Sequence, residues 1–339
     1  MYFAAGYRHQ SEGERFSSLV SAFPQVKEVY FPWVREPSGR PILGYGEGDD
    51  TETIKTVLHD ELVALKSLGV RLDLLLNANC YGELAMSREL ELRVKGIIEE
   101  LDSWGCKPET ITAASPFIAH VVKKRFPEIE TRASVNMRIT TLQAMAYLAP
   151  WFDSFYIGRD VHRNLDNVKR FSDWAHSNGK TVGILANSGC LRNCPWQTYH
   201  DNLIAHSYEA MGTPRSVNFN PHLCWTMYEL ESKLPEILKA TWIRPEDIDR
   251  YEPYVDFVKL ATRQHQRMAL VLDAYSSRSF HGNLLDLLEP GFAPAFYKYG
   301  VMLDNSRFPE DWAQTVARCD RGCNECGYCE EVFKRIAIR

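Results

Sequence analysis

The sequence lacks a long apolar run, a secretory leader and an excess of positive charge. None of its 339 residues belongs to an uninterrupted apolar stretch of about 18 residues, which a membrane-spanning helix needs. The first 16 residues carry no basic region followed by an apolar segment, as a secretory signal does. A formal net charge of −5 argues against a protein that coats nucleic acid through bulk positive charge. We therefore expect a cytoplasmic protein that binds neither membranes nor bulk nucleic acid.

Cysteine, by contrast, is unusually frequent and unevenly placed. In a reducing compartment, clustered cysteines bind metals more often than they form disulfides. Cys106 directly follows Gly105 at the end of a predicted helix and is expected to be a packing residue. The nine cysteines are Cys80, Cys106, Cys190, Cys194, Cys224, Cys319, Cys323, Cys326 and Cys329.

Short apolar runs alternate with amphipathic stretches along most of the chain. Eight such runs read as strands, and this alternation favours an α/β fold, a (β/α)8 TIM-like barrel, over a doubly wound open sheet, which gives a similar pattern. Helices are predicted between them, for example over Thr51–Leu68 and Tyr228–Ala240. The strand candidates are Lys27–Trp33, Arg71–Asn77, Thr110–Ala114, Arg132–Asn136, Ser154–Gly158, Thr181–Asn187, Ser216–Asn220 and Asp256–Leu260.

The cysteine-rich C-terminal stretch departs from this alternation. We expect a barrel domain over residues 1–305 and a cysteine-rich, metal-binding tail over residues 306–339. In a (β/α)8 barrel, function gathers at the carboxyl ends of the strands and in the loops that follow them. We call this end of the barrel the barrel mouth.

Polar and basic residues fall repeatedly where predicted strands end. Arg159, Lys259 and Arg263 are candidates for holding an anionic group, because arginine offers a bidentate fork to carboxylate or phosphate. Asn77 and Asn187 are candidates for orienting a substrate by hydrogen bonds, although asparagine at these places also caps helices. These five residues are the predicted catalytic set for a small-molecule substrate.

Two groups of cysteines have metal-ligand spacing. Cys190 and Cys194 follow one predicted strand, and Cys224 follows the next, so the three thiols are predicted to converge at the barrel mouth on a 4Fe–4S cluster. The fourth ligand of that cluster stays open, with Cys80 one possibility. A second, denser group has gaps of three, two and two residues and favours another iron–sulfur site, with zinc as the alternative. It consists of Cys319, Cys323, Cys326 and Cys329.

Between about Arg71 and Arg263 the sequence resembles the collagenase-like peptidase family U32. The resemblance lies in Asn77, the Ser115-Pro116 turn, the Asn-Ser-Gly-Cys190 segment, Leu223-Cys224 and the strand from Phe257 to Arg263. Some members of this family are oxygen-independent hydroxylases with a 4Fe–4S cluster in the barrel mouth. The resemblance thus implies a barrel with cluster ligands at Cys190, Cys194 and Cys224. Lys259 and Arg263 match the family's Lys-Ile-Glu-Gly-Arg run, whereas Leu-Ala-Thr replaces its Ile-Glu-Gly.

The leading hypothesis is an iron–sulfur-dependent redox enzyme, with oxygen-independent hydroxylation of a small organic or anionic substrate as the expected chemistry. The tail cluster would then be the entry point for electrons from a donor or a protein partner. One alternative is a peptidase-like hydrolase, although the chain has no His-Glu-x-x-His motif, and only Cys190 with His200 or His222 resembles a thiol–imidazole pair. The others are a non-catalytic iron–sulfur partner or electron carrier, and a zinc-stabilised binding barrel.

Overall fold

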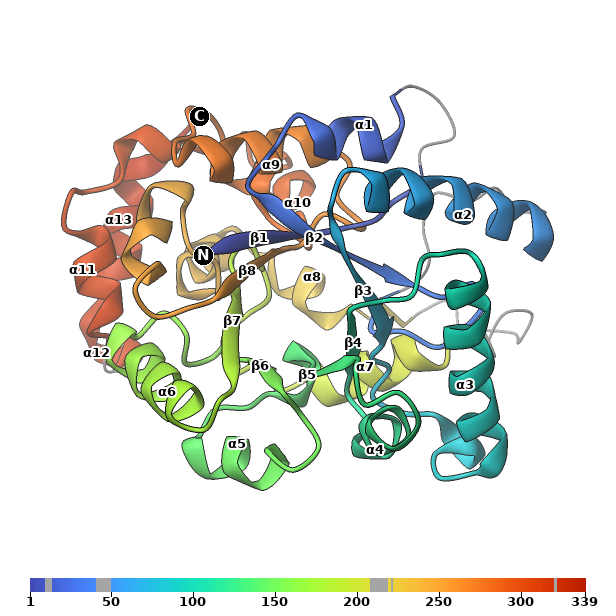
Figure 1. The fold of residues 1–339 in the computed structure, drawn as a ribbon. Helices are drawn as coiled ribbons and strands as arrows, with labels where there is room; N and C mark the ends of the chain where they lie inside the picture. The colour runs from blue at the N-terminus through green and yellow to red at the C-terminus, as the bar shows by residue number, and fades with distance from the viewer. Residues whose placement is uncertain (10–13, 41–49, 208–218, 221, 320–321) are drawn as a thin grey trace.

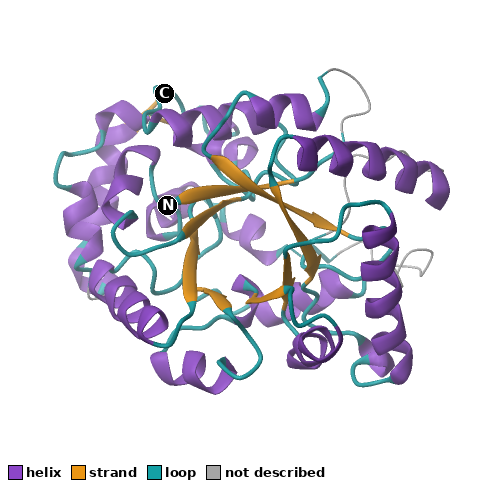
Figure 2. Ribbon diagram, in the orientation of Figure 1, coloured by secondary structure: helices purple, strands orange, loops and turns teal. Residues whose placement is uncertain are grey.

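Eight parallel strands close into a barrel that a ring of helices surrounds (Figures 1 and 2). This computed structural model describes residues 1–9, 14–40, 50–207, 219–220, 222–319 and 322–339. β1 closes the barrel because Ala4 is paired with Glu28 of β2 on one side and with Lys259 of β8 on the other. The barrel strands are β1 (Tyr2–Gly6), β2 (Val26–Pro32), β3 (Arg71–Leu76), β4 (Thr110–Ala113), β5 (Glu130–Ala133), β6 (Ser154–Tyr156), β7 (Thr181–Leu185) and β8 (Phe257–Leu260). The predicted (β/α)8 barrel is confirmed, and the open-sheet alternative is wrong.

Seven of the eight predicted strands coincide with barrel strands, and one prediction was wrong. Residues 216–218 of the expected strand Ser216–Asn220 lie outside the described residues, and Phe219 and Asn220 are in no strand. The eighth barrel strand is β1, whose five residues Tyr-Phe-Ala-Ala-Gly include no β-branched side chain. It forms because β2 and β8 both supply hydrogen-bonding partners, which a local sequence window does not contain.

The helix predicted over Thr51–Leu68 is confirmed as α2, which spans Thr51–Ser67. The Asp50 carboxylate accepts a hydrogen bond from the Thr53 backbone N–H at 2.8 Å and caps α2. The helices are α1 (Phe16–Ser21), α2 (Thr51–Ser67), α3 (Arg88–Ser103), α4 (Pro116–Arg125), α5 (Leu142–Leu148), α6 (Leu165–Ser177), α7 (Gln197–Ala205), α8 (Leu223–Met227), α9 (Met268–Ser277), α10 (Ala293–Tyr297), α11 (Trp312–Ala317), α12 (Cys323–Cys326) and α13 (Tyr328–Ile336). No helix in the described ranges is both long and apolar enough to cross a membrane.

The helix expected over Tyr228–Ala240 is a correction. The segment instead forms a 3₁₀ helix, η3 (Glu231–Lys239), with Pro235 inside it. Proline removes a backbone donor and its ring clashes with an α-helical turn, so a regular α-helix does not form there. The other 3₁₀ helices are η1 (Gly82–Leu84), η2 (Val135–Met137), η4 (Pro245–Tyr251), η5 (Leu284–Leu287) and η6 (Asn305–Arg307).

A charged layer fills part of the barrel interior. Arg132 of β5 forms a bidentate ion pair with Glu28 of β2, and its Nη1 lies 3.6 Å from Asp73 of β3. The side chains of all three residues are 1% exposed or less. Charges this deeply buried require compensation, and the pairing across three strands provides it.

The C-terminal segment packs on one side of the barrel. An antiparallel pair, β9 (Met302–Leu303) with β10 (Ala337–Ile338), returns the chain end to the barrel domain. The Trp312 ring of α11 stacks on Trp242 with centroids 5.7 Å apart and on Tyr328 of α13 at 6.0 Å. A separate apolar cluster, which includes Trp242, Phe292 and Ile336, therefore joins the tail to the barrel.

Candidate functional site

The five residues predicted as catalytic all come from elements that end at the barrel mouth. Each is at most 9% exposed. Asn77 directly follows β3, Asn187 comes two residues after β7, and Lys259 lies within β8. Arg159 and Arg263 follow β6 and β8, each three residues after the strand ends. Parallel strands deliver their carboxyl ends to the same side of a barrel, so the fold brings these residues to one end.

Lys259 lies between two tyrosine rings. Its Nζ is 3.7 Å from the centroid of Tyr30 and 5.2 Å from that of Tyr156. Burial lowers the pKa of the Lys259 ammonium, an effect that Asp73 opposes and Arg263 reinforces. The two aromatic faces stabilise the remaining charge by cation–π interaction. The result is a buried amine with a reduced preference for its protonated form.

Arg263 and Asn77 hold the loop that follows β2. The Arg263 guanidinium donates to Ser38 Oγ at 3.1 Å and to the Arg40 carbonyl at 2.9 Å. Asn77 Oδ1 accepts from Ser38 Oγ and from the Gly39 backbone N–H, at 3.2 and 2.9 Å. A Cβ atom on Gly39 would stand 2.4 Å from Asn136 Nδ2, so the loop approaches its neighbours too closely for a larger residue.

That loop delivers Arg40, which the sequence analysis missed. Its Nε lies 3.5 Å from Glu289 Oε1. Burial disfavours the charge, but Glu289, Cys190 and Asp201 more than offset this effect and raise the pKa of Arg40. The available signal was its place in the loop that follows the predicted strand Lys27–Trp33. Arg40 thus adds a cation close to the Cys190 thiol.

Arg159 and Asn187 occupy different environments. Arg159 donates to Ser188 Oγ at 3.3 Å, and its charge acts on both Cys194 and Asp201. Asn187 is fully buried, and its amide donates to the carbonyls of Ala261 and Leu287. Its Oδ1 accepts from the Ala261 backbone N–H at 2.6 Å. The Asn187 side chain is therefore engaged within the protein, whereas Arg159 borders the cysteine loop.

Cys190, Cys194 and Cys224 lie close enough for their charges to interact. Burial, and then the Cys190 and Cys194 thiolates, raise the pKa of Cys224 to about 11. Burial also raises the pKa of Cys194, which the Trp196 backbone N–H partly offsets. In the ranges that the structure describes, no three His, Cys, Asp or Glu side chains are arranged to hold a single metal ion. Cys80, the possible fourth ligand, is half-buried, and its sulfur accepts from the Gly82 N–H at 3.4 Å.

Two histidines lie next to the cysteine loops. The rings of His200 and His222 meet edge to face with centroids 5.2 Å apart. Burial, and then the Arg40 charge, lower the pKa of His200 to about 4, so the ring is neutral near pH 7. A surface groove of about 540 Å³ runs beside His222 and Trp225 toward Lys298.

The four tail cysteines lie elsewhere, around a cavity of their own. All four line a space of about 520 Å³ beside α11 and α13. The neighbouring charges that act on Cys329 are those of Arg163, Cys319, Cys323 and Lys239, and none of the mouth cysteines is among them. Cys106 is 1% exposed within the apolar core, as expected for a packing residue.

Comparison with known proteins places the barrel among related folds. No family model matches the chain. An uncharacterized protease from Methanocaldococcus jannaschii is 24% identical over 273 residues, which cover 80% of this chain and 78% of that protein. The structure of the U32 peptidase Mk0906 superposes with a TM-score of 0.54 and 13% identity, covering 76% of this chain and 92% of its own.

This chain resembles the U32 peptidases. At 13% identity, the likeness to the U32 peptidase Mk0906 is one of fold. A glycoside hydrolase family 5 mannosidase from Rhizomucor miehei superposes with a TM-score of only 0.45 at 10% identity, covering 86% of this chain and 94% of its own. That similarity reflects the common barrel and carries no argument about activity.

Proposed function

We propose that this chain is an iron–sulfur-dependent redox enzyme that acts on a small anionic substrate at the barrel mouth. The observation that supports the proposal is the electrostatic interaction of Cys190 and Cys194, in the loop after β7, with Cys224 of helix α8. Thiolates are the usual ligands of 4Fe–4S clusters, so the chemistry of these three side chains suits such a group, although they are not arranged around a single metal ion in this structure. A bound cluster would supply one-electron transfer and a Lewis-acidic iron at the mouth.

The chain's own residues would bind and orient the substrate. Arg40, Arg159 and Lys259 bring positive charge to the same end of the barrel as the three thiols. Carboxylates bind such a set through charge-assisted hydrogen bonds, most strongly to the arginine forks. The side chains of Arg263, Asn77 and Asn187 form hydrogen bonds with backbone groups of the protein's own loops. We therefore assign them a positioning role.

The expected reaction transfers one oxygen atom from an anionic organic donor to a C–H bond of the substrate. The C–H bond becomes C–OH and loses two electrons, while the donor loses one oxygen atom and gains two electrons. When no substrate is present to accept the oxygen atom, the donor takes up two electrons from an external reductant and two protons, and its oxygen atom leaves as water. Neither reaction consumes molecular oxygen.

The test uses anaerobically purified protein that has been reduced with dithionite. We expect anionic hydroxy-dicarboxylates, added in a panel, to restore the absorbance near 400 nm at a rate that saturates with concentration. Arg159→Met should raise the half-saturating concentration about tenfold, the effect of losing one charge-assisted contact. Arg170→Met, an exposed arginine on α6, is the matched control. If no donor is consumed, or if the two variants behave alike, the proposal fails and an electron carrier becomes the better description.

A peptidase-like hydrolase is the second candidate. It is favoured by the M. jannaschii relative, which is named a protease, and by the contact of His200 with His222 near Cys224. However, a thiol nucleophile needs a lowered pKa, and burial raises that of Cys224. Hydrolysis of gelatin by metal-free protein, abolished in Cys190→Ala, would decide for this candidate.

A further inference from the structure

Four cysteines of the tail surround one cavity at the side of the barrel. Cys323 and Cys326 lie on the short helix α12 and are exposed, whereas Cys319 and Cys329 are half-buried. The cavity that they line has a volume of about 520 Å³. The cavity has room for either a zinc ion or a cuboidal cluster held by several thiolates, so metal and sulfide analysis distinguishes the two.

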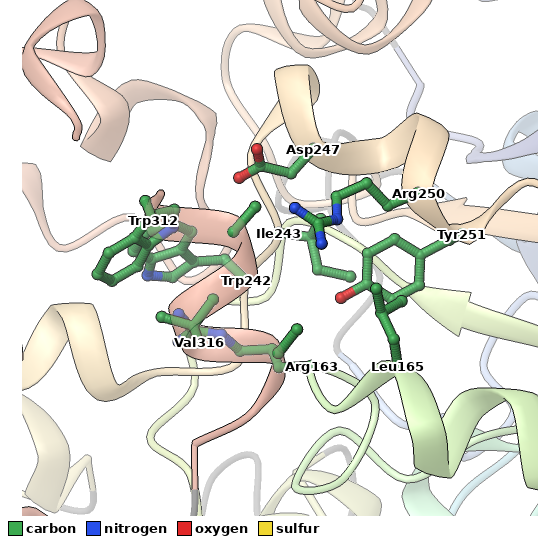
Figure 3. Close-up of a pocket in the computed structure, with 11 residues that line it drawn as sticks. Arg163, Leu165, Trp242, Ile243, Asp247, Arg250, Tyr251, Trp312 and Val316 are labelled. Carbon is green, nitrogen blue, oxygen red and sulfur yellow. The ribbon is translucent and has the colours of Figure 1, made fainter. Parts of the chain in front are cut away.

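Arg163 is a buried cation whose charge acts on Cys329, although its side chain lines a neighbouring small pocket and not the cysteine-lined cavity itself. It is 4% exposed, donates to the carbonyls of Leu238 and Ala240, and lies 5.2 Å from the ring centroids of both Trp242 and Trp312 (Figure 3). Within the described residues, no carboxylate forms an ion pair with Arg163. A guanidinium taken out of water requires a counter-charge.

The Cys319 and Cys329 thiols lie near this cation, because the charge of each acts on Arg163.

Lys239 adds a second cation to the wall of the cavity. Its Nζ lies 2.7 Å from Glu236 and 3.8 Å from Glu330, and the Cys323 thiolate also acts on it. A cluster bound through four thiolates carries a net negative charge. Lys239, which pairs with Glu236 and Glu330, and Arg163, whose charge acts on Cys329, would offset part of that charge.

The site is also tied to the barrel by aromatic stacking. Trp312 lies between Trp242 and Tyr328, and Tyr328 is the residue before Cys329. Thr241, next to Trp242, donates its backbone N–H to the Cys190 carbonyl at 3.2 Å. Aromatic packing thus holds the Tyr328–Cys329 segment against the barrel.

We propose that Cys319, Cys323, Cys326 and Cys329 hold a 4Fe–4S cluster at a second site, in a cavity that none of the three mouth cysteines lines. This inference goes beyond the proposed function and does not depend on it. Ligation would join α11, α12 and α13 to the barrel through Arg163 and Lys239.

Alkylation of the native protein tests the site without any substitution. Free thiols at the exposed positions Cys323 and Cys326 would react quickly with iodoacetamide, because the thiolate is the reactive form. We expect both to react at least about tenfold more slowly in anaerobically purified protein than after the metal has been stripped. Peptide mass spectrometry locates the modified residues. Equal rates before and after stripping would overturn the proposal.

Metal analysis of matched variants identifies the group. Cys323→Ser/Cys326→Ser should lose about four irons and four sulfides per chain relative to the wild type. Cys106→Ala, a buried cysteine outside both groups, should lose none. Cys190→Ser/Cys224→Ser should keep the tail iron, so failure of the mouth site is told apart from failure of the tail site. One zinc without sulfide in the wild-type tail would overturn the cluster assignment.

Discussion

The Lys259 ammonium lies 3.7 Å from the centroid of the Tyr30 ring, where β8 and β2 reach the barrel mouth. Burial lowers the pKa of this amine, and Asp73 only partly restores it. We therefore predict that Lys259 titrates below the ordinary lysine value of about 10.4. Lys169 should titrate above that value, because its hydrogen bond to the Asp173 carboxylate raises its pKa.

Both amines can be followed in one experiment. NMR of the protein with ¹³C-methylated lysines gives a pH titration for each, and Lys259→Arg assigns the first signal. A Lys259 signal that titrates with or above that of Lys169 contradicts the description of the mouth as a desolvating site.

Removing the buried Arg132 should be severely destabilising. Arg132→Met leaves Glu28 and Asp73 without their shared cation inside the barrel. We expect the free energy of unfolding to fall by about 3–5 kcal/mol, as for other broken buried ion pairs. Lys169→Met, which breaks an exposed pair on α6, should leave it unchanged within error. Urea unfolding of the two variants measures this difference. Equal unfolding midpoints for Arg132→Met and Lys169→Met would refute a stabilising role for the buried network of Arg132, Glu28 and Asp73.

Alanine at Gly39 and at Gly96 should have opposite effects. A Cβ on Gly39 meets Asn136 Nδ2 at 2.4 Å, so the loop carrying Arg40 must shift, at a cost of about 1–3 kcal/mol. Gly96 lies within α3 with nothing within 4 Å of its added Cβ. Gly96→Ala should therefore stabilise the protein by about 0.4–1 kcal/mol. Thermal unfolding measures both, and a stabilised Gly39→Ala would show that the loop is not tightly held.

His162 should make stability fall in mild acid. It is fully buried, and its Nε2 contacts the Thr241 carbonyl. Burial lowers its pKa from 6.5 to about 3 in the folded protein, so the unfolded chain binds one more proton between these values. Stability from this group is therefore present above pH 6.5 and is lost, by about 1.4 kcal/mol per pH unit, as the pH falls toward 3.

The matched variants His162→Gln and His120→Gln isolate this slope. Urea unfolding at several pH values between 7 and 4 should show a shallower acid loss for His162→Gln. His120, which is exposed, should leave the wild-type slope intact. If the free energy of unfolding falls with pH equally for the wild type, His162→Gln and His120→Gln, then His162 is protonated in the folded state.

Local sequence patterns predicted most of the barrel but not its closing strand. The apolar side chains of a run such as Arg71–Asn77 predict a strand directly. Tyr2–Gly6, in contrast, forms a strand only because it pairs with β2 and β8. Pro235 was visible in the sequence, and its effect on the expected helix was underestimated. The polar residues predicted at strand ends do lie at the carboxyl ends of the barrel strands, and their role in a site stays a prediction. Arg40 was missed because its role depends on how Asn77 and Arg263 hold its loop, a tertiary relationship.

The central claim is that the barrel-mouth thiols hold an iron–sulfur cluster. The most direct measurement is the iron and acid-labile sulfide content of the Cys323→Ser/Cys326→Ser protein, purified anaerobically, with and without Cys224→Ser. Without Cys224→Ser, about four irons and four sulfides should remain per chain; with it, both should disappear. A Cys323→Ser/Cys326→Ser protein that is already free of iron, or one whose iron is unaffected by Cys224→Ser, would contradict the claim.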